Sequence, residues 1–439
     1  MGGLPRRATF LSNQRAKGLP DLTLDSGNIF ADRPPSEASL ESTLEKAQLL
    51  VRIMSQLGYE AAAVGEMELY LGLENLRALS EKASFRFLSA NLTGPDGALL
   101  FDSHRVFRKG SLTVGVVGLT SAPSNQSLFE QRMGQSRVID PVKAAADVVS
   151  GIRNRCDLVV VLSSLGYDQD LDLARAVNGI DIIIGAKNRR FMKKPVIEEG
   201  TMVTTGYFQG RAVGQITVTL QGDHRGWASR EELAFIRRQI DTARERVRTP
   251  GDEERLARLL ENQEKAQALT LYDADMVNLT PDFTGDPDVA GIISAYRQGL
   301  NAKQPGGTTG GGEEGPVRYI GAEKCRGCHE GRYRFWSRTP HRAALSTLAL
   351  KDADADPDCV PCHVTGYERL TGYWPKAPRR DLEGVQCESC HGIGSLHAAT
   401  PELHSLLHLP AAPQCIDCHT EEQDDDFDFL RDKVKVCAE

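Results

Sequence analysis

Hydrophobic residues in the first half of the chain follow two alternating patterns. Short apolar runs of strand length are separated by longer segments with helical spacing, such as Ser39–Leu57 and Pro141–Arg153. Strands that alternate with helices predict an α/β fold with a largely parallel sheet. The strand-like runs are Leu22–Leu24, Ala61–Val64, Phe85–Leu92, Leu112–Leu119, Asp157–Leu162 and Asp181–Ile184, and Pro195–Leu220 predicts adjacent strands joined by glycine-containing turns.

The pattern becomes helical over residues 227–300. Leu233 and Ile240 lie on one apolar stripe, and charged residues fill the other positions. A break at Thr249–Asp252 precedes a second stripe that begins at Leu256. This arrangement predicts a helical hairpin that serves as a structural arm.

A polar, glycine-rich segment at Asn301–Gly315 is the clearest boundary in the chain. Such a composition is typical of a flexible linker. The sequence after it is rich in cysteine and has few long periodic runs. We therefore expect four parts: an α/β domain at 1–222, a helical arm at 223–300, a linker at 301–317 and a cysteine-rich domain at 318–439.

Composition and charge narrow the class of protein. The chain has 439 residues, of which 40% are hydrophobic and 26% charged, as in ordinary globular proteins with two or three domains. The formal net charge of -8 argues against a nucleic-acid partner. No apolar stretch has the length that a transmembrane helix requires.

Eight of the ten cysteines belong to one repeated motif, Cys-x-x-Cys-His. In this spacing, two thiols can each add to a vinyl group of one porphyrin, and the histidine that follows can bind the iron as its proximal ligand. The motifs therefore predict four covalently bound haem c groups. Their residues are Cys325, Cys328 and His329; Cys359, Cys362 and His363; Cys387, Cys390 and His391; and Cys415, Cys418 and His419.

A zinc site is the main alternative for cysteines and histidines, but zinc sites rarely place a histidine directly after every cysteine pair. The segment Cys325–His419 is also too short to form a sufficient core from side chains alone while holding four haems. We therefore expect a mostly α-helical domain with the porphyrins as its core, and we expect the haem-free segment to be largely unfolded.

Four further histidines lie among the motifs and are candidates for the distal iron ligand: His341, His397, His404 and His408. A second histidine favours pure electron transfer, whereas an open position lets a small molecule bind. The inventory allows four haems with two histidines each, or three such haems and one open iron. An electron carrier and a haem enzyme that reduces a small nitrogen or oxygen species therefore both remain open, as do homo-oligomers and filaments.

The region Tyr319–Thr420 resembles the tetrahaem cytochromes related to the electron acceptor of hydroxylamine oxidoreductase. The matching positions include Tyr333, Trp336 and Thr339 after the first motif, and Val-Thr-Gly-Tyr367 after the second. The resemblance implies a periplasmic or extracellular electron carrier that acts on redox partner proteins. It also implies that His341 and His397 are distal ligands, and it leaves His404 and His408 unassigned.

The first 220 residues resemble another family, the calcineurin-like metallophosphatases of the secreted nucleotidase branch. The resemblance implies a sandwich of two sheets flanked by helices. The matching segments, in the order of the family, are Gly2–Thr9, Leu24–Asn28, Val64–Glu68, Val161–Gly166, Asp181–Gly185 and Gly206–Gly214.

The metal ligands of that family are missing here. Asn28 stands in place of a bridging aspartate, Glu66-Met67 in place of Asn-His, and Ser164 in place of a histidine. The Gly-His-x-His loop is replaced by Ala186–Arg189. Because a dinuclear site needs oxygen and imidazole ligands, we expect no phosphoesterase activity and a docking or assembly role.

Three smaller features complete the sequence picture. The first metal-binding element would lie upstream of Gly2, and Met1–Pro20 has no apolar signal core, so we expect an incomplete N-terminus that lacks its export signal. Cys156 precedes an apolar run and is expected to be a buried thiol. Cys437 lies in the acidic tail, where it could pair with another chain.

Overall fold

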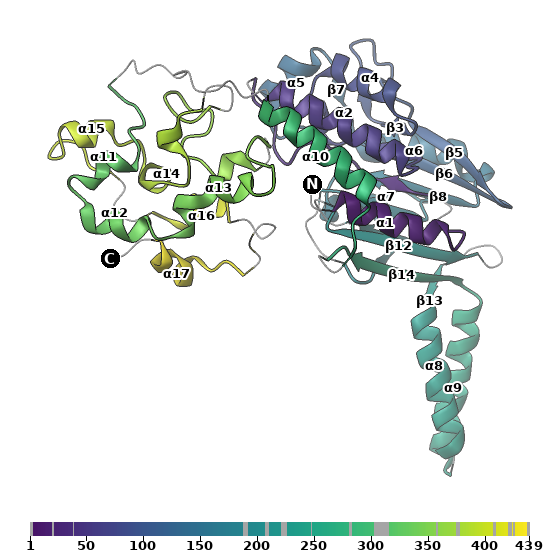
Figure 1. Ribbon diagram of the computed structural model, residues 1–439. Coiled ribbons are helices and arrows are strands. Elements are labelled where there is room, and N and C mark those ends of the chain that lie inside the picture. Colours follow the sequence, from purple (N-terminus) through teal and green to yellow (C-terminus); the bar gives the residue numbers. More distant parts are fainter. Residues whose placement is uncertain are drawn as a thin grey trace. The chain divides into compact units, whose positions relative to one another are not determined.

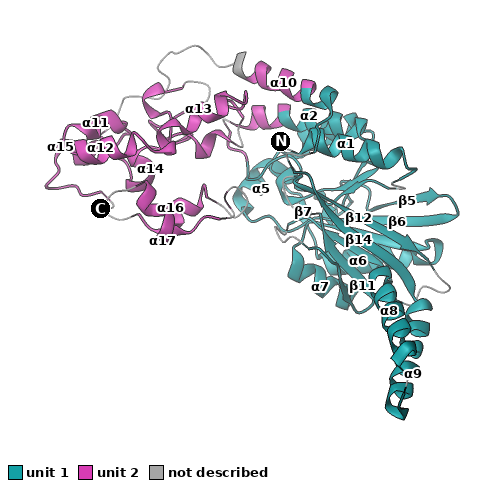
Figure 2. Ribbon diagram, turned by 60° about the horizontal axis from the view of Figure 1, so that its bottom comes forward, with its two compact units in different colours: residues 1–34, 46–290 teal, residues 35–45, 291–439 magenta. Residues whose placement is uncertain are grey.

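The structure is a computed structural model, and the chain divides into two compact units (Figure 2). Unit 1 consists of residues 1–34 and 46–290, and unit 2 of residues 35–45 and 291–439. None of the helices in the described part of the chain has the length and apolarity needed to span a bilayer. The described residues are 3–19, 22–37, 39–187, 192–206, 210–220, 226–246, 248–280, 283–302, 316–356, 359–374, 378–406, 410–419, 424 and 426–436.

A six-stranded sheet is the centre of unit 1, with the strand order β10-β11-β9-β8-β6-β5. The inner pairs are parallel, and the outermost pair at each edge is antiparallel. This sheet confirms the largely parallel arrangement that the sequence predicts. Its strands are β5 (His104–Lys109), β6 (Leu112–Leu119), β8 (Leu158–Ser163), β9 (Ile182–Gly185), β10 (Val196–Glu198) and β11 (Thr201–Thr205).

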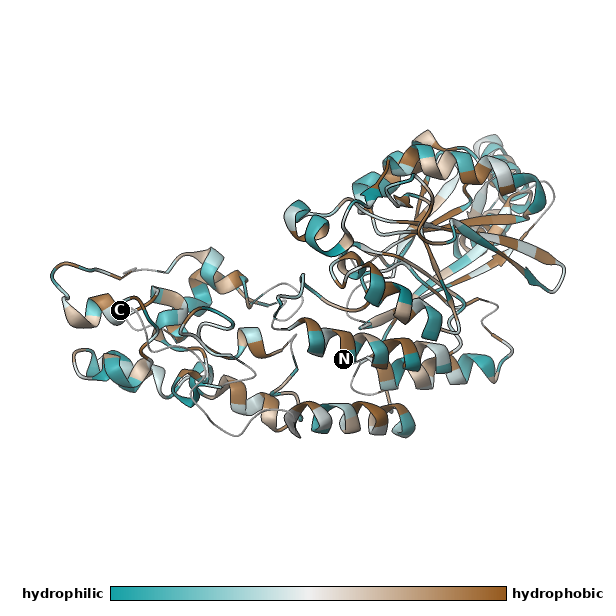
Figure 3. Cartoon of the chain, turned by 90° about the horizontal axis from the view of Figure 1, so that it is seen from above, coloured by the Kyte–Doolittle hydropathy of each residue, from teal (hydrophilic) through white to brown (hydrophobic). Residues whose placement is uncertain are grey.

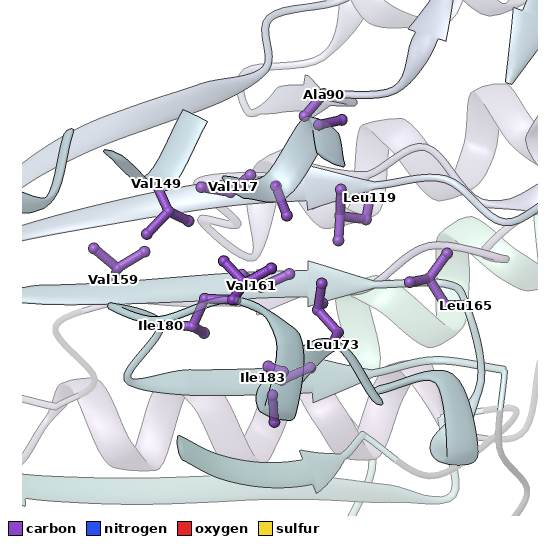
Figure 4. Close-up of a cluster of buried hydrophobic side chains, with 14 of the residues drawn as sticks. Ala90, Val117, Leu119, Val149, Val159, Val161, Leu165, Leu173, Ile180 and Ile183 are labelled. Atoms are coloured by element: carbon purple, nitrogen blue, oxygen red, sulfur yellow. The ribbon is translucent and has the colours of Figure 1, made fainter. Parts of the chain in front are cut away.

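Strand β8 shows that the sheet is covered on both faces, because all six of its residues are buried. Successive side chains of a strand point to opposite faces. Val159 and Val161 pack against helices α6 (Pro141–Ile152) and α7 (Tyr167–Ala176), in the cluster of Figure 4. Val160 packs in a second cluster on the other face.

Three small sheets complete the β structure of unit 1, with the orders β1-β2-β3, β12-β14-β13 and β4-β7. Ala63, Leu88 and Trp227 from the first two of them pack in the second cluster with Val160. The result is the two-sheet sandwich flanked by helices that the sequence predicts. The strands are β1 (Leu24–Asp25), β2 (Ala61–Ala63), β3 (Arg86–Leu88), β4 (Leu92–Thr93), β7 (Arg137–Val138), β12 (Ala212–Thr219), β13 (Trp227–Ser229) and β14 (Thr270–Asn278).

The predicted helical arm is present as α8 (Arg230–Arg246) and α9 (Pro250–Gln267), which project together from the sheet region (Figure 1). A capping box between Thr249 and Asp252 starts α9. The helical pattern does not extend to residue 300, however, because Thr270–Asn278 form strand β14. The other helices of unit 1 are α1 (Leu4–Arg15), α2 (Leu40–Gln56), which begins in unit 2, α3 (Glu66–Leu69), α4 (Leu73–Lys82), α5 (Gln126–Met133) and a 3-10 turn at Arg153–Arg155.

Unit 2 is built from short helices, and its described residues form no named strand. This confirms the mostly α character that the sequence predicts for the C-terminal region. The helices are α10 (Pro287–Ala302), which begins in unit 1, α11 (Ala322–Arg326), α12 (Glu330–Trp336), α13 (Ala344–Ala349), α14 (Cys387–His391), α15 (Ser395–Ala399), α16 (Ala412–Ile416) and α17 (Phe429–Asp432), with 3-10 turns at Pro340–Ala343, Val360–Cys362, Arg380–Leu382 and Lys433–Lys435.

The two units differ in how much apolar surface they bury. In Figure 3 the strands of unit 1 carry long stretches of hydrophobic residues, and these form two extensive buried clusters. Unit 2 has one small cluster around Leu345, Val360 and Leu382. Several of its large apolar side chains are exposed, namely Val317, Phe335, Leu350, Leu370, Leu403, Ile416, Leu430 and Val434.

Candidate functional sites

The third Cys-x-x-Cys-His motif forms helix α14, whereas the first and fourth start in the last turn of α11 and α16, and the second surrounds the 3-10 turn Val360–Cys362. In the first motif, the His329 amide donates to the Cys325 carbonyl at 3.0 Å, and in the fourth the His419 amide donates to the Cys415 carbonyl at 2.8 Å. Residues three and four apart on a helical turn lie on the same side. The two thiols and the imidazole of a motif can therefore reach one porphyrin.

Three of the motif turns lie next to one another, although they are far apart in sequence. Helix α14, which contains the third motif, contacts α11 at the first motif and α16 at the fourth motif. The Cys325 thiol donates towards the Cys387 sulfur, and this interaction raises the pKa of Cys325 and lowers that of Cys387. Groups bound at these motifs would be close enough for electrons to pass between them.

Three of the candidate imidazoles have a fixed partner at Nδ1. The Nδ1 atom of His363 lies 2.7 Å from the Ala344 carbonyl oxygen, and that of His397 lies 2.7 Å from the His404 carbonyl oxygen. The Nδ1 atom of His419 lies 2.7 Å from the Asp424 carboxylate. A proton on Nδ1 leaves the lone pair of Nε2 free for a metal, so this is the arrangement expected of metal-binding histidines.

Two pairs of histidine rings lie at a centre-to-centre distance that suits two ligands of one iron. The ring centres of His329 and His397 are 6.1 Å apart, and those of His341 and His419 are 5.9 Å apart. With metal–nitrogen bonds of about 2.0 Å and about 1.1 Å from each nitrogen to its ring centre, two imidazoles on opposite sides of a metal have centres about 6 Å apart. Each pair joins a motif histidine to a histidine that the sequence suggests as a distal ligand.

The surroundings of these pairs also fit a bound haem. Burial and the nearby His419 lower the pKa of His341, which favours the neutral, metal-binding form of the ring. Ile416, inside the fourth motif, is 50% exposed, and Leu403, next to His404, is 78% exposed. Apolar side chains such as these would be covered by porphyrin rings.

The other predicted ligands are placed differently. The side chain of His404 is exposed, and its backbone carbonyl holds His397. His391 ends α14, the helix formed by the third motif. His408 and Cys437 lie outside the described residues. The sequence did not predict that Ala344 and Asp424 accept hydrogen bonds from Nδ1 of His363 and His419, because such acceptors have no fixed spacing from the Cys-x-x-Cys-His motif.

A second candidate site lies in unit 1, at the positions that the resemblance to metallophosphatases assigns to metal ligands. Glu66 is 2% exposed there and accepts hydrogen bonds from the Tyr70 hydroxyl at 2.8 Å and the Ser124 amide at 2.6 Å. The Ser124 hydroxyl also donates to it, and the Lys187 ammonium forms an ion pair with it at 2.8 Å. Burial opposes ionisation of Glu66, but the bonds from Lys187 and Ser124 outweigh it and lower its pKa.

Asn28 and Ser164, which replace metal ligands of the metallophosphatases, also form hydrogen bonds within the protein. The Asn28 side-chain oxygen accepts from the Met67 amide at 3.1 Å, and Asn28 adopts a positive φ of 57°. The Ser164 hydroxyl accepts from the Ser121 amide at 2.8 Å. Asp25 is half-buried; the loss of water around it raises its pKa, and the nearby Arg7 opposes that shift.

No cluster of three metal-binding side chains exists among the described residues. Asn188 and Arg189 lie outside them. The sequence identified Lys187 only as a lost ligand position. Lys187 and Glu66 are 121 positions apart in the sequence, so no local sequence pattern predicts their ion pair.

Comparison with known proteins gives one resemblance for the C-terminal region. Residues 324–392 match the family described as cytochrome c554 and c-prime. Cytochrome c-554 of Nitrosomonas europaea is 36% identical over 91 residues, which are 17% of this chain and 39% of that protein. These matches confirm the predicted resemblance of the C-terminal region to the cytochromes of this family.

The N-terminal region gives a separate resemblance. The 5'-nucleotidase of Vibrio cholerae is 27% identical over 249 residues, 48% of this chain and 44% of that protein. The chain thus spans less than half the length of either of these two relatives.

Two solved structures resemble the fold of the chain. The sulfate thiohydrolase SoxB of Thermus thermophilus, solved with glycerol, has a TM-score of 0.52 at 17% identity and covers 70% of this chain and 48% of its own. The calcineurin-like phosphoesterase YfkN of Bacillus subtilis has a TM-score of 0.50 at 17% identity and covers 68% of this chain and 89% of its own. These comparisons confirm the metallophosphatase-like fold of unit 1.

Proposed function

We propose that this chain is a multihaem c-type cytochrome that carries electrons through four covalently bound haems in the periplasm or outside the cell. The paired imidazoles, His329 with His397 and His341 with His419, are the observation that supports this proposal most strongly. When bound, haem iron supplies reversible one-electron chemistry. The resemblance of residues 324–392 to cytochrome c554 points in the same direction.

The side chains of unit 2 have separate roles in this proposal. The eight motif cysteines anchor the porphyrins, and the four motif histidines supply the proximal ligands. His341 and His397 supply distal ligands, while the Ala344 and His404 carbonyls orient the rings of His363 and His397. Two histidines on one iron leave no position for a substrate, so such haems transfer electrons to redox partner proteins.

Carbon monoxide binding to the reduced protein tests this function. We expect the haems held by the two histidine pairs to be low-spin and to change little in the visible spectrum under carbon monoxide, because they have no open position. A large change in the spectrum of one or more haems would instead support an enzyme that reduces a small nitrogen or oxygen species.

For unit 1 we propose a docking or assembly module without phosphoesterase activity. Glu66 supports this view, because its carboxylate accepts four hydrogen bonds and already has a protein cation, Lys187, as its partner. A dinuclear centre needs carboxylate oxygens that are free to bind metal. We also propose the domain boundaries at 222, 300 and 317 that the sequence predicts.

A phosphatase assay tests the second proposal. We expect the full chain to release no phosphate from nucleoside monophosphates with manganese, zinc or magnesium present. Hydrolysis that depends on added metal and is lost on chelation would refute it.

A further inference from the structure

We propose that Asp424 is a positioning residue that holds His419 and lowers the reduction potential of the haem at the fourth motif. The inference rests on the proposed function, because it concerns one of the four haems. It starts from a difference among the imidazole partners. His363 and His397 face neutral backbone carbonyls at Nδ1, whereas His419 faces a carboxylate at the same distance of 2.7 Å.

The surroundings of His419 hold its ring in place. The Phe427 ring stacks on it, with ring centres 4.6 Å apart and an angle of 18° between the planes. His341 lies at 5.9 Å from it, at the spacing of a second axial ligand. Asp424, Phe427 and His341 therefore fix the position of the imidazole from three sides.

The segment that carries Phe427 is itself held by local bonds. The Asp428 side chain accepts from the Arg431 amide at 2.8 Å and caps α17. Arg431 in turn pairs with Asp426 at 3.3 Å and with Asp432 at 2.8 Å. These bonds hold residues 426–432 in a defined local conformation, and the ring contact of Phe427 with His419 joins this segment to the fourth motif.

A carboxylate acts on the ring differently from a carbonyl. It draws the Nδ1 proton towards itself, which increases electron density at Nε2 and strengthens the bond to oxidised, more positive iron. Stabilising the oxidised state lowers the reduction potential. The side chains of His419 and Asp424 are 34% and 42% exposed, so water weakens the effect without removing it. We therefore expect the fourth haem to have a lower potential than it would have with a neutral acceptor at Nδ1 of His419.

The test compares Asp424→Asn with Asp426→Asn in the haem-loaded full chain by a spectroelectrochemical titration. Both variants remove one negative charge from the same segment, but only Asp424 contacts His419. At a potential near the midpoint of the fourth haem, we expect Asp424→Asn to raise its reduced-to-oxidised ratio about tenfold, which is about 59 mV for a one-electron couple. Asp426→Asn should change this ratio by less than twofold, and Asp424→Glu should keep it close to that of the parent protein.

Electron paramagnetic resonance gives a second readout, since the signal of one low-spin haem should change in Asp424→Asn alone. Unchanged potentials in Asp424→Asn, or equal shifts in both asparagine variants, would overturn the inference. Loss of the fourth haem from Asp424→Asn with its retention in Asp424→Glu would support the positioning role. A parent protein with fewer than four haems would instead refute the proposed function, so the two failures are distinguishable.

Discussion

Asp170 in unit 1 is a buried carboxyl group whose two oxygens have different surroundings. The Ser163 hydroxyl donates to Oδ1, whereas Oδ2 has no hydrogen-bond partner in the described structure. Burial raises the pKa of Asp170 to about 7, although the bond from Ser163 opposes the shift. Its normal value is 3.8, so the folded protein keeps a proton here that the unfolded chain releases.

Asp170 should therefore make the stability of unit 1 depend on pH. The folded state binds more protons than the unfolded state between about pH 4 and 7, so its contribution to stability falls as pH rises through that window. We expect Asp170→Asn to remove this decline and to gain up to about 4 kcal/mol at pH 8. Urea unfolding of the full chain at pH 5 and pH 8, monitored by circular dichroism, measures the free energy of unfolding at each pH. The same decline in the variant as in the parent would contradict the assignment.

Lys187 is the second residue whose effect can be measured. Removing its charge in Lys187→Met leaves the buried Glu66 carboxylate without its ammonium partner, and we expect a loss of about 2 kcal/mol because Lys187 itself is partly exposed. The double variant Glu66→Gln with Lys187→Met should recover part of that loss. Thermal unfolding of the four proteins completes the cycle.

Lys194→Met is the matched control for Lys187. Lys194 pairs with Glu231 at 2.8 Å, but both side chains are more than two-thirds exposed. Because this pair is exposed to water, we expect Lys194→Met to leave the stability of the protein nearly unchanged. Equal effects of the two lysine variants would show that Lys187 has no special role.

At the scale of elements, periodicity predicted most of unit 1 and failed in one informative place. Strand β8 is a continuous apolar run, and its burial on both faces matches that pattern. Strand β14 was predicted as part of a helical region. It is a strand because Asp273 and Asp275 alternate with less exposed residues, and because β12 pairs with it along eight residues. That partner lies more than fifty positions away, so no local pattern reveals it.

In the candidate haem site too, some residues could be predicted from local sequence spacing and others could not. The motif spacing identified the thiols and the proximal histidines, because each set lies within one turn. The distal pairs could not be assigned from sequence, since His329 and His397 meet only through the packing of unit 2. Similarly, nothing in the sequence shows that His404 offers its carbonyl to His397.

Helix α15 positions His397, and replacing this histidine should open one iron. We expect His397→Ala to bind one more carbon monoxide per reduced chain than the parent protein, because its partner His329 then has no ring opposite it. His404→Ala is the control, since only its backbone contacts His397, and its carbon monoxide binding should match that of the parent. The reverse result would make His404 the ligand. Optical titration of the two variants gives the count.

On the scale of the whole molecule, the two units have different sources of stability. Unit 1 buries two large clusters of its own side chains, whereas unit 2 has one small cluster. A segment with so little buried apolar surface needs another source of stability, which in our account is the haem.

Protein made without haem attachment should therefore lose structure in one unit only. We expect brief proteolysis to degrade residues 318–439 of this haem-free chain and to leave a resistant fragment that contains most of unit 1. The haem-loaded chain should resist cleavage in both regions. Mass spectrometry of the fragments identifies the cleavage sites, and a haem-free C-terminal region that resists proteolysis would contradict the expected role of haem in folding.

The number of covalently bound haems is the most direct check on this account. The intact mass of the matured, denatured protein should exceed that of its polypeptide by four haem groups, and digestion should place one haem on each of the peptides with Cys325, Cys359, Cys387 and Cys415. A colourless protein, or a mass that corresponds to fewer than four attached haems, would contradict it.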